Sequence, residues 1–147
     1  MSRTQGILYV AEPPVAYLVR PPLVVDCSAI CGILFDEPWR TEATAKLAGR
    51  TLFAPNLLDY EVVSVALKKH RQQWPRESLA KAMSDYNCYQ IELVETNAKE
   101  QLDLAIRYDL SSYDAAYLWL AAELKAPLAT FDKKLGRAAE IHLAGLS

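Results

Sequence analysis

The chain has 147 residues, of which 52% are hydrophobic and 23% are charged, and its formal net charge at pH 7 is −2. This length suits one domain with a substantial core, and the composition is typical of soluble globular proteins. The small negative charge argues against a protein covered by positive charge, although a local basic patch can still bind phosphate groups.

The first 22 residues predict an extended arm or hairpin. Two short runs of β-branched and aromatic residues flank the sequence AEPP, and Pro21 and Pro22 separate them from the rest of the chain. Glu12, Pro13 and Pro14 interrupt the hydrophobic sequence, which argues against a signal-peptide core or a membrane span. We expect an arm over residues 1–22, serving in dimerisation or packing, and one domain over residues 23–147.

Short hydrophobic strands then alternate with helical segments. The expected strands are residues 23–26, 51–55, 88–95 and 127–132, with a fifth over 141–145. The expected helices are residues 28–35, 41–49, 56–73, 75–86, 96–109, 111–126 and 133–140. Such alternation is typical of a parallel sheet covered on both faces. The sequence therefore predicts an α/β protein, a three-layer α/β/α sandwich with a mostly parallel sheet of four to five strands.

Residues favoured at helix ends support several of these boundaries. Asn56, Thr96 and Ser111 are expected to cap the N-termini of their helices. Pro75 suits a first helical position, and Gly49 suits a helix end.

The three cysteines include no CxxC motif. Cys27 and Cys31 lie four residues apart on an expected helix, but neither His70 nor His142 is near in sequence to complete a zinc site. We interpret these two and Cys88 as buried, reduced thiols, which fits a cytoplasmic protein.

Four acidic residues stand near strand ends and helix starts. Asp26 and Asp132 end the first and fourth expected strands, at the edge where parallel α/β sheets bind ligands. Asp114 lies in the first turn of its helix, and each of these aspartates alone could simply cap or stabilise a helix end. Glu61 lies beyond the first turn, among mostly hydrophobic neighbours, where a charge is costly without a cation.

Carboxylates gathered at one edge would repel one another unless a cation is bound. Their oxygen atoms favour Mg²⁺ or Mn²⁺ over zinc, and a pair of such ions can activate water for phosphodiester hydrolysis. We expect four residues to meet near a common point as metal ligands and catalytic residues: Asp26, Glu61, Asp114 and Asp132.

Polar and basic neighbours extend this site. Ser28 and Thr130 are expected to hydrogen-bond the carboxylates or metal-bound water, although hydroxyl groups more often serve the local backbone. The expected phosphate-binding residues are Lys68, Lys69, Arg71, Lys133, Lys134 and Arg137. The first three equally suit a solvated helix end, whereas the lysines at 133–134 begin a helix, where cations are disfavoured.

Together these motifs resemble PIN-domain nucleases, specifically the VapC-type toxins of bacterial toxin–antitoxin pairs. VVDCSAI resembles the family's opening D-x-S-A, and APNLLDYEVVSVALKK resembles its glutamate helix. LSSYDAAYLWLAAELKAPLATFDKKL resembles its Y-D-A-x-Y-L-x-L-A followed by T-x-D. The resemblance runs from about Leu23 to Ala144, whereas the first 22 residues depart from a pattern in which the first strand begins almost at the N-terminus.

The resemblance implies an α/β/α sandwich and an endoribonuclease that depends on Mg²⁺ or Mn²⁺. It implies the same acidic set, an RNA substrate, a homodimer and a small antitoxin that covers or enters the active-site groove. It does not identify which RNA is cleaved.

Two other functions remain open. One is phosphoryl transfer through an aspartyl-phosphate at Asp26, although the sequence DCS lacks the second aspartate that such phosphatases place two residues later. The other is a catalytically silent PIN-like module that binds RNA or a protein without cleaving it.

Overall fold

The structure, a computed structural model, describes residues 8–9, 11 and 20–146. Most of the arm expected over residues 1–22 lies outside the described residues. The strands are β1 (Pro22–Val25), β2 (Thr51–Pro55), β3 (Glu92–Val94) and β4 (Leu128–Ala129). The helices are α1 (Cys27–Leu34), α2 (Arg40–Leu47), α3 (Leu57–Arg71), α4 (Arg76–Cys88), α5 (Ala98–Tyr108), α6 (Ser112–Leu124) and α7 (Lys133–Ala144).

The described strands form one parallel sheet in the order β3-β2-β1-β4. β1 lies between β2 and β4, with Leu23 opposite Leu52 and Val24 opposite Leu128. Val24 and Val25 are fully buried, as expected for a central parallel strand with helices on both faces. The carboxyl ends of β1 and β4 therefore meet at the same edge of the sheet.

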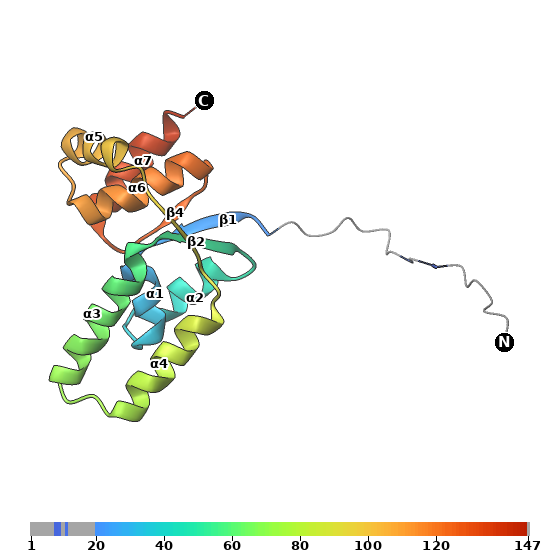
Figure 1. Ribbon diagram of the computed structural model, residues 1–147, viewed down its shortest axis with the longest axis vertical. Helices are drawn as coiled ribbons and strands as arrows, with labels where there is room; N and C mark the ends of the chain where they lie inside the picture. Colours follow the sequence, from blue (N-terminus) through green and yellow to red (C-terminus); the bar gives the residue numbers. More distant parts are fainter. Residues whose placement is uncertain (1–7, 10, 12–19, 147) are drawn as a thin grey trace.

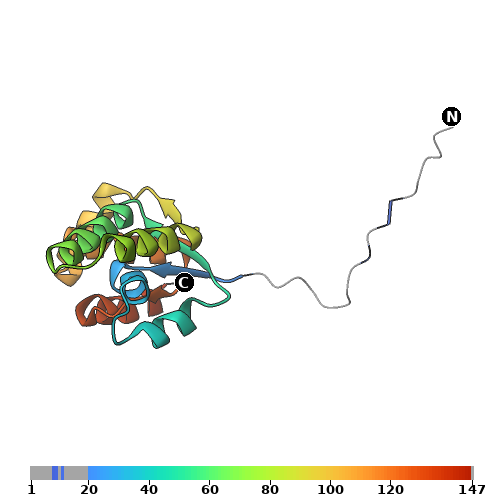
Figure 2. The same ribbon diagram turned by 90° about the horizontal axis from the view of Figure 1, so that it is seen from below.

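The helices form two layers around this sheet, which confirms the expected α/β/α sandwich. Connections from β1 to β2 to β3 run in one direction across the sheet, and the connection from β3 to β4 returns past them. Right-handed crossovers place such connections on opposite faces. Figure 1 shows α1–α4 on one side of the sheet and α5–α7 on the other, and Figure 2 shows α3 and α4 side by side.

Helix α6 forms the centre of one layer. It packs against β1, β2 and β4 on one side and contacts both α5 and α7. Ala115, Ala116, Leu118 and Leu120 are all buried, because a helix enclosed on all sides must be hydrophobic around its circumference. Its first turn is consequently held in a fixed position at the carboxyl edge of the sheet.

The fifth strand expected over residues 141–145 is wrong, because α7 continues through Ala144. Leu135, Ala138 and Ala139 are buried at helical spacing, and His142 continues this face one turn later. The His142 ring accepts or donates a hydrogen bond of 2.9 Å with the Tyr108 hydroxyl. Ile141, the β-branched residue that suggested a strand, is 68% exposed.

Two other strand boundaries also differ. The third strand is only Glu92–Val94, because α4 extends to Cys88 into the sequence expected to be extended. The fourth strand ends at Ala129, so that Asp132 lies three residues beyond it, at the start of α7. β1 begins at Pro22, one residue inside the segment assigned to the arm.

The capping residues were predicted with mixed success. Ser111 caps α6 as expected, with its hydroxyl accepting a hydrogen bond from the Asp114 amide. Asn56 precedes α3 but has helical backbone angles and makes no side-chain capping hydrogen bond. Asn97, rather than Thr96, caps α5 by accepting from the Glu100 amide.

Candidate active site

Asp26 connects the end of β1 to the start of α1 and is only 5% exposed. Its Oδ1 atom accepts hydrogen bonds from the Ser28 hydroxyl at 2.7 Å and the Ala29 amide at 3.0 Å. Its Oδ2 atom accepts from the Thr130 hydroxyl. A carboxylate oxygen can accept about two hydrogen bonds, so Oδ2 keeps one lone pair that these protein contacts do not use.

The same two hydroxyl groups connect Asp26 to the turn between β4 and α7. Ser28 Oγ accepts from the Phe131 amide at 2.8 Å, and Thr130 Oγ1 accepts from the Asp132 amide at 3.0 Å. Each hydroxyl thus contacts both a carboxylate and local backbone, which combines the two roles considered from the sequence. The network fixes the Asp26 carboxylate relative to Asp132.

Trp39 packs against this network from outside. Its indole N–H donates to the Ser28 carbonyl at 3.2 Å, and its ring lies 5.6 Å from that of Phe131. Gly32 allows this approach, because a Cβ atom at that position would lie 2.3 Å from the indole nitrogen. Neither Trp39 nor Gly32 was predicted from the sequence to support the site. A glycine inside a helix, which costs about 1 kcal/mol relative to alanine, was the available signal.

Glu61 lies in the second turn of α3 and is partly buried. Its Oε1 atom accepts a hydrogen bond of 2.6 Å from the hydroxyl of Tyr117, a residue of α6 that is 1% exposed. Tyr117 therefore orients Glu61 from the opposite layer of the sandwich. No role for Tyr117 was predicted from the sequence, although a buried tyrosine hydroxyl usually has a polar partner.

Asp114 and Asp132 each lie at a helix start. Asp114 is in the first turn of α6, and its amide donates to Ser111 Oγ at 3.1 Å. Asp132 is the N-cap of α7, with Oδ1 accepting from the Leu135 amide at 2.8 Å. Both helix-end roles considered from the sequence are present, and Asp132 still has its Oδ2 atom outside that hydrogen bond.

Burial raises the pKa values of Asp26, Glu61 and Asp114 above those of ordinary carboxyl groups. Repulsion between neighbouring carboxylates adds to this effect: Asp114 raises the pKa of both Asp26 and Glu61, and Asp132 raises that of Asp114. Hydrogen bonds from Thr130, Ser28 and Ala29 oppose the rise at Asp26. The acidic side chains are therefore near enough to affect one another electrostatically.

The structure brings the four acidic residues near one another, but it does not show them meeting at one point as the sequence led us to expect. Among the described residues, no group of three or more His, Cys, Asp or Glu side chains is arranged so that it could hold a metal ion. The donor chemistry nevertheless suits a hard cation, since every candidate atom is a carboxylate oxygen. Mg²⁺ is commonly held by only one or two carboxylates and keeps several waters, so such an ion does not require a cluster of three protein ligands.

The two groups of basic residues differ in their surroundings. Lys133, Lys134 and Arg137 are exposed and line a hollow of about 390 Å³ together with Tyr108 and Ile141. The charge of Lys134 acts on Asp114 and lowers its pKa, which places this basic surface beside the acidic residues. Lys134 also forms an exposed ion pair of 3.3 Å with Asp109.

Lys68, Lys69 and Arg71 lie at the far end of α3. Lys68 lies seven positions after Glu61, which corresponds to about 10 Å along the helix. Lys69 is paired with Glu37 at 3.0 Å and lies over the ring of Trp74. These contacts within the protein account for the position of Lys69, whereas Lys68 and Arg71 are exposed.

A hollow of about 560 Å³ adjoins the acidic edge. It is lined by Cys27, Leu57, Tyr60, Glu61, Ser64, Val65 and Tyr113. The hydrogen bond with Cys31 and burial raise the pKa of Cys27, which keeps this cysteine a neutral thiol. Cys31 is buried as expected, but Cys27 is only partly buried and Cys88 is exposed, so the expectation of three buried thiols holds fully for Cys31 alone.

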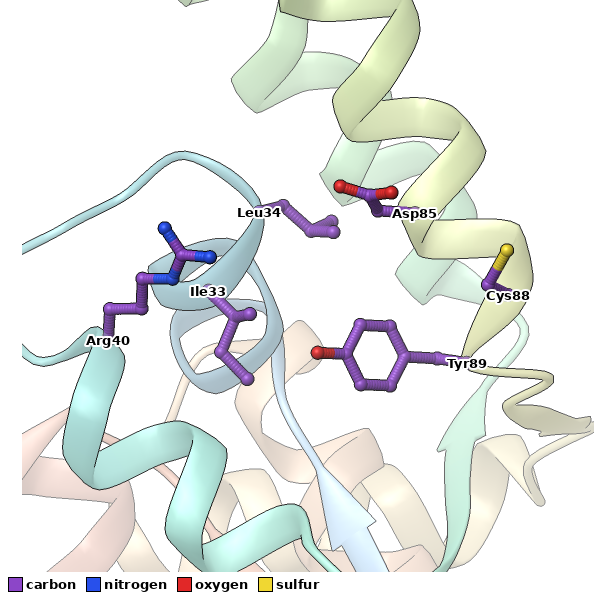
Figure 3. Close-up of a pocket in the computed structure, with 6 residues that line it drawn as sticks. All are labelled: Ile33, Leu34, Arg40, Asp85, Cys88 and Tyr89. Carbon is purple, nitrogen blue, oxygen red and sulfur yellow. The ribbon is translucent and has the colours of Figure 1, made fainter.

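Another hollow, of about 280 Å³, lies between α1, α2 and α4 (Figure 3). The Tyr89 hydroxyl points into it, with Arg40 and Asp85 at its rim. Arg40 forms an ion pair with Asp36, and Asp85 forms one with Lys81; in each pair the partners are four positions apart in sequence. None of the four candidate acids lines it.

The fold and the acidic edge define a class of α/β/α proteins with carboxylates at the ends of parallel strands. Residues 23–141 match the PIN domain, and the chain belongs to the PIN domain family. It is 29% identical over 119 residues to Ribonuclease VapC3 of Pyrobaculum aerophilum, a match that covers 77% of this chain and 91% of that protein.

A solved structure shows the same fold. The crystal structure of PAE2754 from Pyrobaculum aerophilum matches with a TM-score of 0.60 and 23% sequence identity, covering 84% of this chain and 88% of that one. That structure shows the fold alone, whereas the PIN domain match and the identity to Ribonuclease VapC3 confirm the resemblance to VapC-type PIN proteins. In the part of the chain that the structure describes, no helix has the length and hydrophobicity needed to cross a membrane.

Proposed function

We propose that this protein is an endoribonuclease that cleaves RNA phosphodiester bonds with the help of Mg²⁺ or Mn²⁺. The observation that carries the proposal is the buried Asp26 carboxylate, which keeps an unused lone pair at the sheet edge where three other carboxylates act on it or on one another. Membership of the PIN domain family and similarity to a protein named a ribonuclease support the same conclusion.

Asp26, Glu61, Asp114 and Asp132 are the residues that would hold the cation, either directly or through the waters that it keeps. The cation would supply activation of water and stabilisation of the leaving oxygen. Its binding also offsets the repulsion and burial that raise the pKa values of three of these carboxyl groups.

The other residues of the site orient the carboxylates and attract the substrate. Ser28 and Thr130 hold both oxygens of Asp26, and Tyr117 holds one oxygen of Glu61, so that these side chains need not reorganise when a charge arrives. Lys133, Lys134 and Arg137 present positive charge beside Asp114, where they can contact phosphates that flank the cleaved bond.

The biological role that fits this activity is the toxin of a toxin–antitoxin pair, with a small antitoxin as partner. Similarity to VapC3 motivates this part of the proposal. A homodimer and a cytoplasmic location are the corresponding proposals for assembly and compartment. A small DNA-binding protein encoded in the adjacent reading frame is the expected antitoxin.

The test is cleavage of a single-stranded oligoribonucleotide by the wild type, Asp26→Asn and Asp114→Asn, each with Mg²⁺ or Mn²⁺. We expect cleavage by the wild type and at least a hundredfold loss in both variants, with circular dichroism unchanged. Asp103→Asn, which removes an exposed carboxylate of α5, is the matched control and should retain activity.

Full activity in both variants, or in excess chelator, would rule out the mechanism. RNA binding without cleavage by the wild type in either metal would instead favour the catalytically silent PIN-like module.

A further inference from the structure

We propose that Tyr60 and Tyr113 bind an unpaired base of the RNA substrate beside the acidic edge. This inference rests on the proposed function and specifies its substrate as single-stranded at the position next to the cleaved bond. Neither tyrosine belongs to the acidic set or to the hydrogen-bonded network that orients it.

The two tyrosines line the same hollow, although they come from opposite layers of the fold. Tyr60 immediately precedes Glu61 on α3, and Tyr113 immediately precedes Asp114 on α6. Glu61 itself also lines the hollow. The cavity is therefore continuous with the acidic edge, and its volume of about 560 Å³ lies within the range of small-ligand sites.

Core packing does not explain these two side chains. Tyr60 is 80% exposed and Tyr113 is 61% exposed. By contrast, Tyr86 and Tyr117 are buried and donate hydrogen bonds to Asp59 and Glu61, respectively. Two exposed aromatic rings over the hydrophobic lining of Leu57 and Val65 form a surface on which a flat, uncharged group can stack.

A base suits this hollow better than a phosphate does. The Glu61 carboxylate lines it and would repel a phosphate, whereas a nucleobase carries no charge and has a face that stacks on aromatic rings. Phosphates have a separate place on the basic surface of α7, where Lys134 acts on Asp114.

These positions set the order in which the bound RNA strand contacts the protein. One base lies between the tyrosines, the cleaved phosphate lies over the acids, and a flanking phosphate lies against Lys133, Lys134 and Arg137. A base inside a duplex has both faces covered by its neighbours, so the nucleotide at the tyrosines must be unpaired.

The experiment measures binding rather than cleavage. A fluorescein-labelled single-stranded oligoribonucleotide is titrated with full-length protein, and binding is followed by fluorescence anisotropy. Every protein compared carries Asp26→Asn, so that cleavage of the RNA does not affect the measurement. On this background we compare Tyr60→Ala, Tyr113→Ala, Tyr60→Phe and Tyr113→Phe. Ile106→Ala, which truncates a 72%-exposed hydrophobic side chain on α5, is the control.

We expect each alanine variant to raise the Kd by roughly 5- to 150-fold, as for loss of one stacked base. The phenylalanine variants keep the ring and should stay within about twofold of the parent, as should Ile106→Ala. A matched oligonucleotide with one abasic position should bind the parent more weakly by a similar factor. It should weaken binding of each alanine variant by a smaller factor, because only one tyrosine ring is left to contact the base.

An unchanged Kd in both alanine variants would overturn the inference, while the cleavage assay on Asp26→Asn would still decide the nuclease proposal. Equal weakening by the abasic position in the parent and in the alanine variants would also overturn it. If the alanine variants bind RNA normally but fail to bind a co-purifying protein, the hollow is a protein interface and the base site is wrong. The converse outcome is that the wild type cuts no RNA while RNA binding still depends on the two tyrosines. That result would support the base site and contradict the nuclease proposal.

Discussion

The hydroxyl group of Thr130 donates a hydrogen bond to the carboxylate of Asp26, although 104 positions separate the two residues in sequence. This contact joins the end of β4 to the end of β1 at the carboxyl edge of the sheet. It also opposes the rise that burial causes in the pKa of Asp26.

Replacement of Thr130 by valine should weaken both the site and the fold. Valine keeps the shape but removes the donor to Asp26 and the acceptor for the Asp132 amide. We expect cleavage to fall by about 10- to 100-fold, because partners of ligating carboxylates have effects of that size. The pKa of Asp26 should rise further, which moves the acidic limb of the pH–rate profile to higher pH.

Thr44→Val is the control for this variant, since the Thr44 hydroxyl donates only to a carbonyl of its own exposed helix. The profile of that control should match the wild type. A Thr130→Val protein with the wild-type rate and acidic limb would show that the contact has no functional effect.

The charge of Asp26 should destabilise the fold when no divalent cation is present. Its pKa is raised in the folded state, so the folded protein binds the proton more tightly than the unfolded chain does. The resulting stabilisation is present at acidic pH and is lost as pH rises through the folded-state pKa. Asp26→Asn should therefore raise the melting temperature of chelator-treated protein at neutral pH.

This gain should shrink as the pH is lowered, because the wild-type carboxyl group becomes protonated as well. Added Mg²⁺ should stabilise the wild type more than the variant, because a ligand that binds only the folded state raises its stability. Thermal melting across a pH series, with and without Mg²⁺, measures both effects. A variant that is less stable than the wild type at neutral pH in chelator would contradict this account of Asp26.

The basic surface of α7 should control the salt dependence of RNA binding. Combined replacement of Lys133, Lys134 and Arg137 by alanine removes up to three phosphate contacts. For single-stranded nucleic acid, the slope of log K against log salt should become shallower by roughly 0.7 per lost contact. Lys46→Ala, at an exposed ion pair on α2, should leave the slope unchanged. An unchanged slope in the triple variant would show that this surface does not contact the phosphates of the RNA.

Gly32→Ala should destabilise the protein through Trp39. The added Cβ atom would lie 2.3 Å from the indole nitrogen, so the ring must move and lose its hydrogen bond to the Ser28 carbonyl. Crowding of this kind costs about 1–3 kcal/mol, more than the roughly 0.5–1 kcal/mol that alanine gains over glycine in a helix.

Gly136→Ala is the matched control, because its added Cβ atom would lie 3.6 Å from Thr130 Cγ2, an ordinary contact. Urea unfolding should show a loss of stability for the Gly32 variant and none for the Gly136 variant. Equal stability of the two would mean that Trp39 relaxes without cost.

The fold was predictable where turn residues bound a short hydrophobic run on both sides. Residues 51–55 form β2 as expected, because a short hydrophobic run between turn residues is typical of a buried strand. Residues 141–145 failed, since a short hydrophobic run fits a helix face equally well and the packing of α7 decides between them. Thr96 failed because the neighbouring Asn97 forms the cap, and Asn56 failed because its backbone is helical and its side chain makes no capping hydrogen bond.

The placement of Asp26 and Asp132 at one edge was predictable from topology, since the parallel strands that precede them end on the same side. The partners of the acids were not, because Tyr117 reaches Glu61 across 56 positions and Trp39 packs on Phe131 from another element. Contacts between distant residues depend on helix packing angles, which local sequence patterns do not encode.

Calorimetric titration with Mn²⁺ shows whether these carboxylates bind a cation, because it observes the protein and the ion without RNA. We predict saturable binding at or below millimolar concentration by the wild type, much weaker binding by Asp26→Asn and Asp114→Asn, and wild-type binding by Asp103→Asn. Absence of binding by the wild type, or equal binding by all four proteins, would contradict the claim that these acids form a cation site.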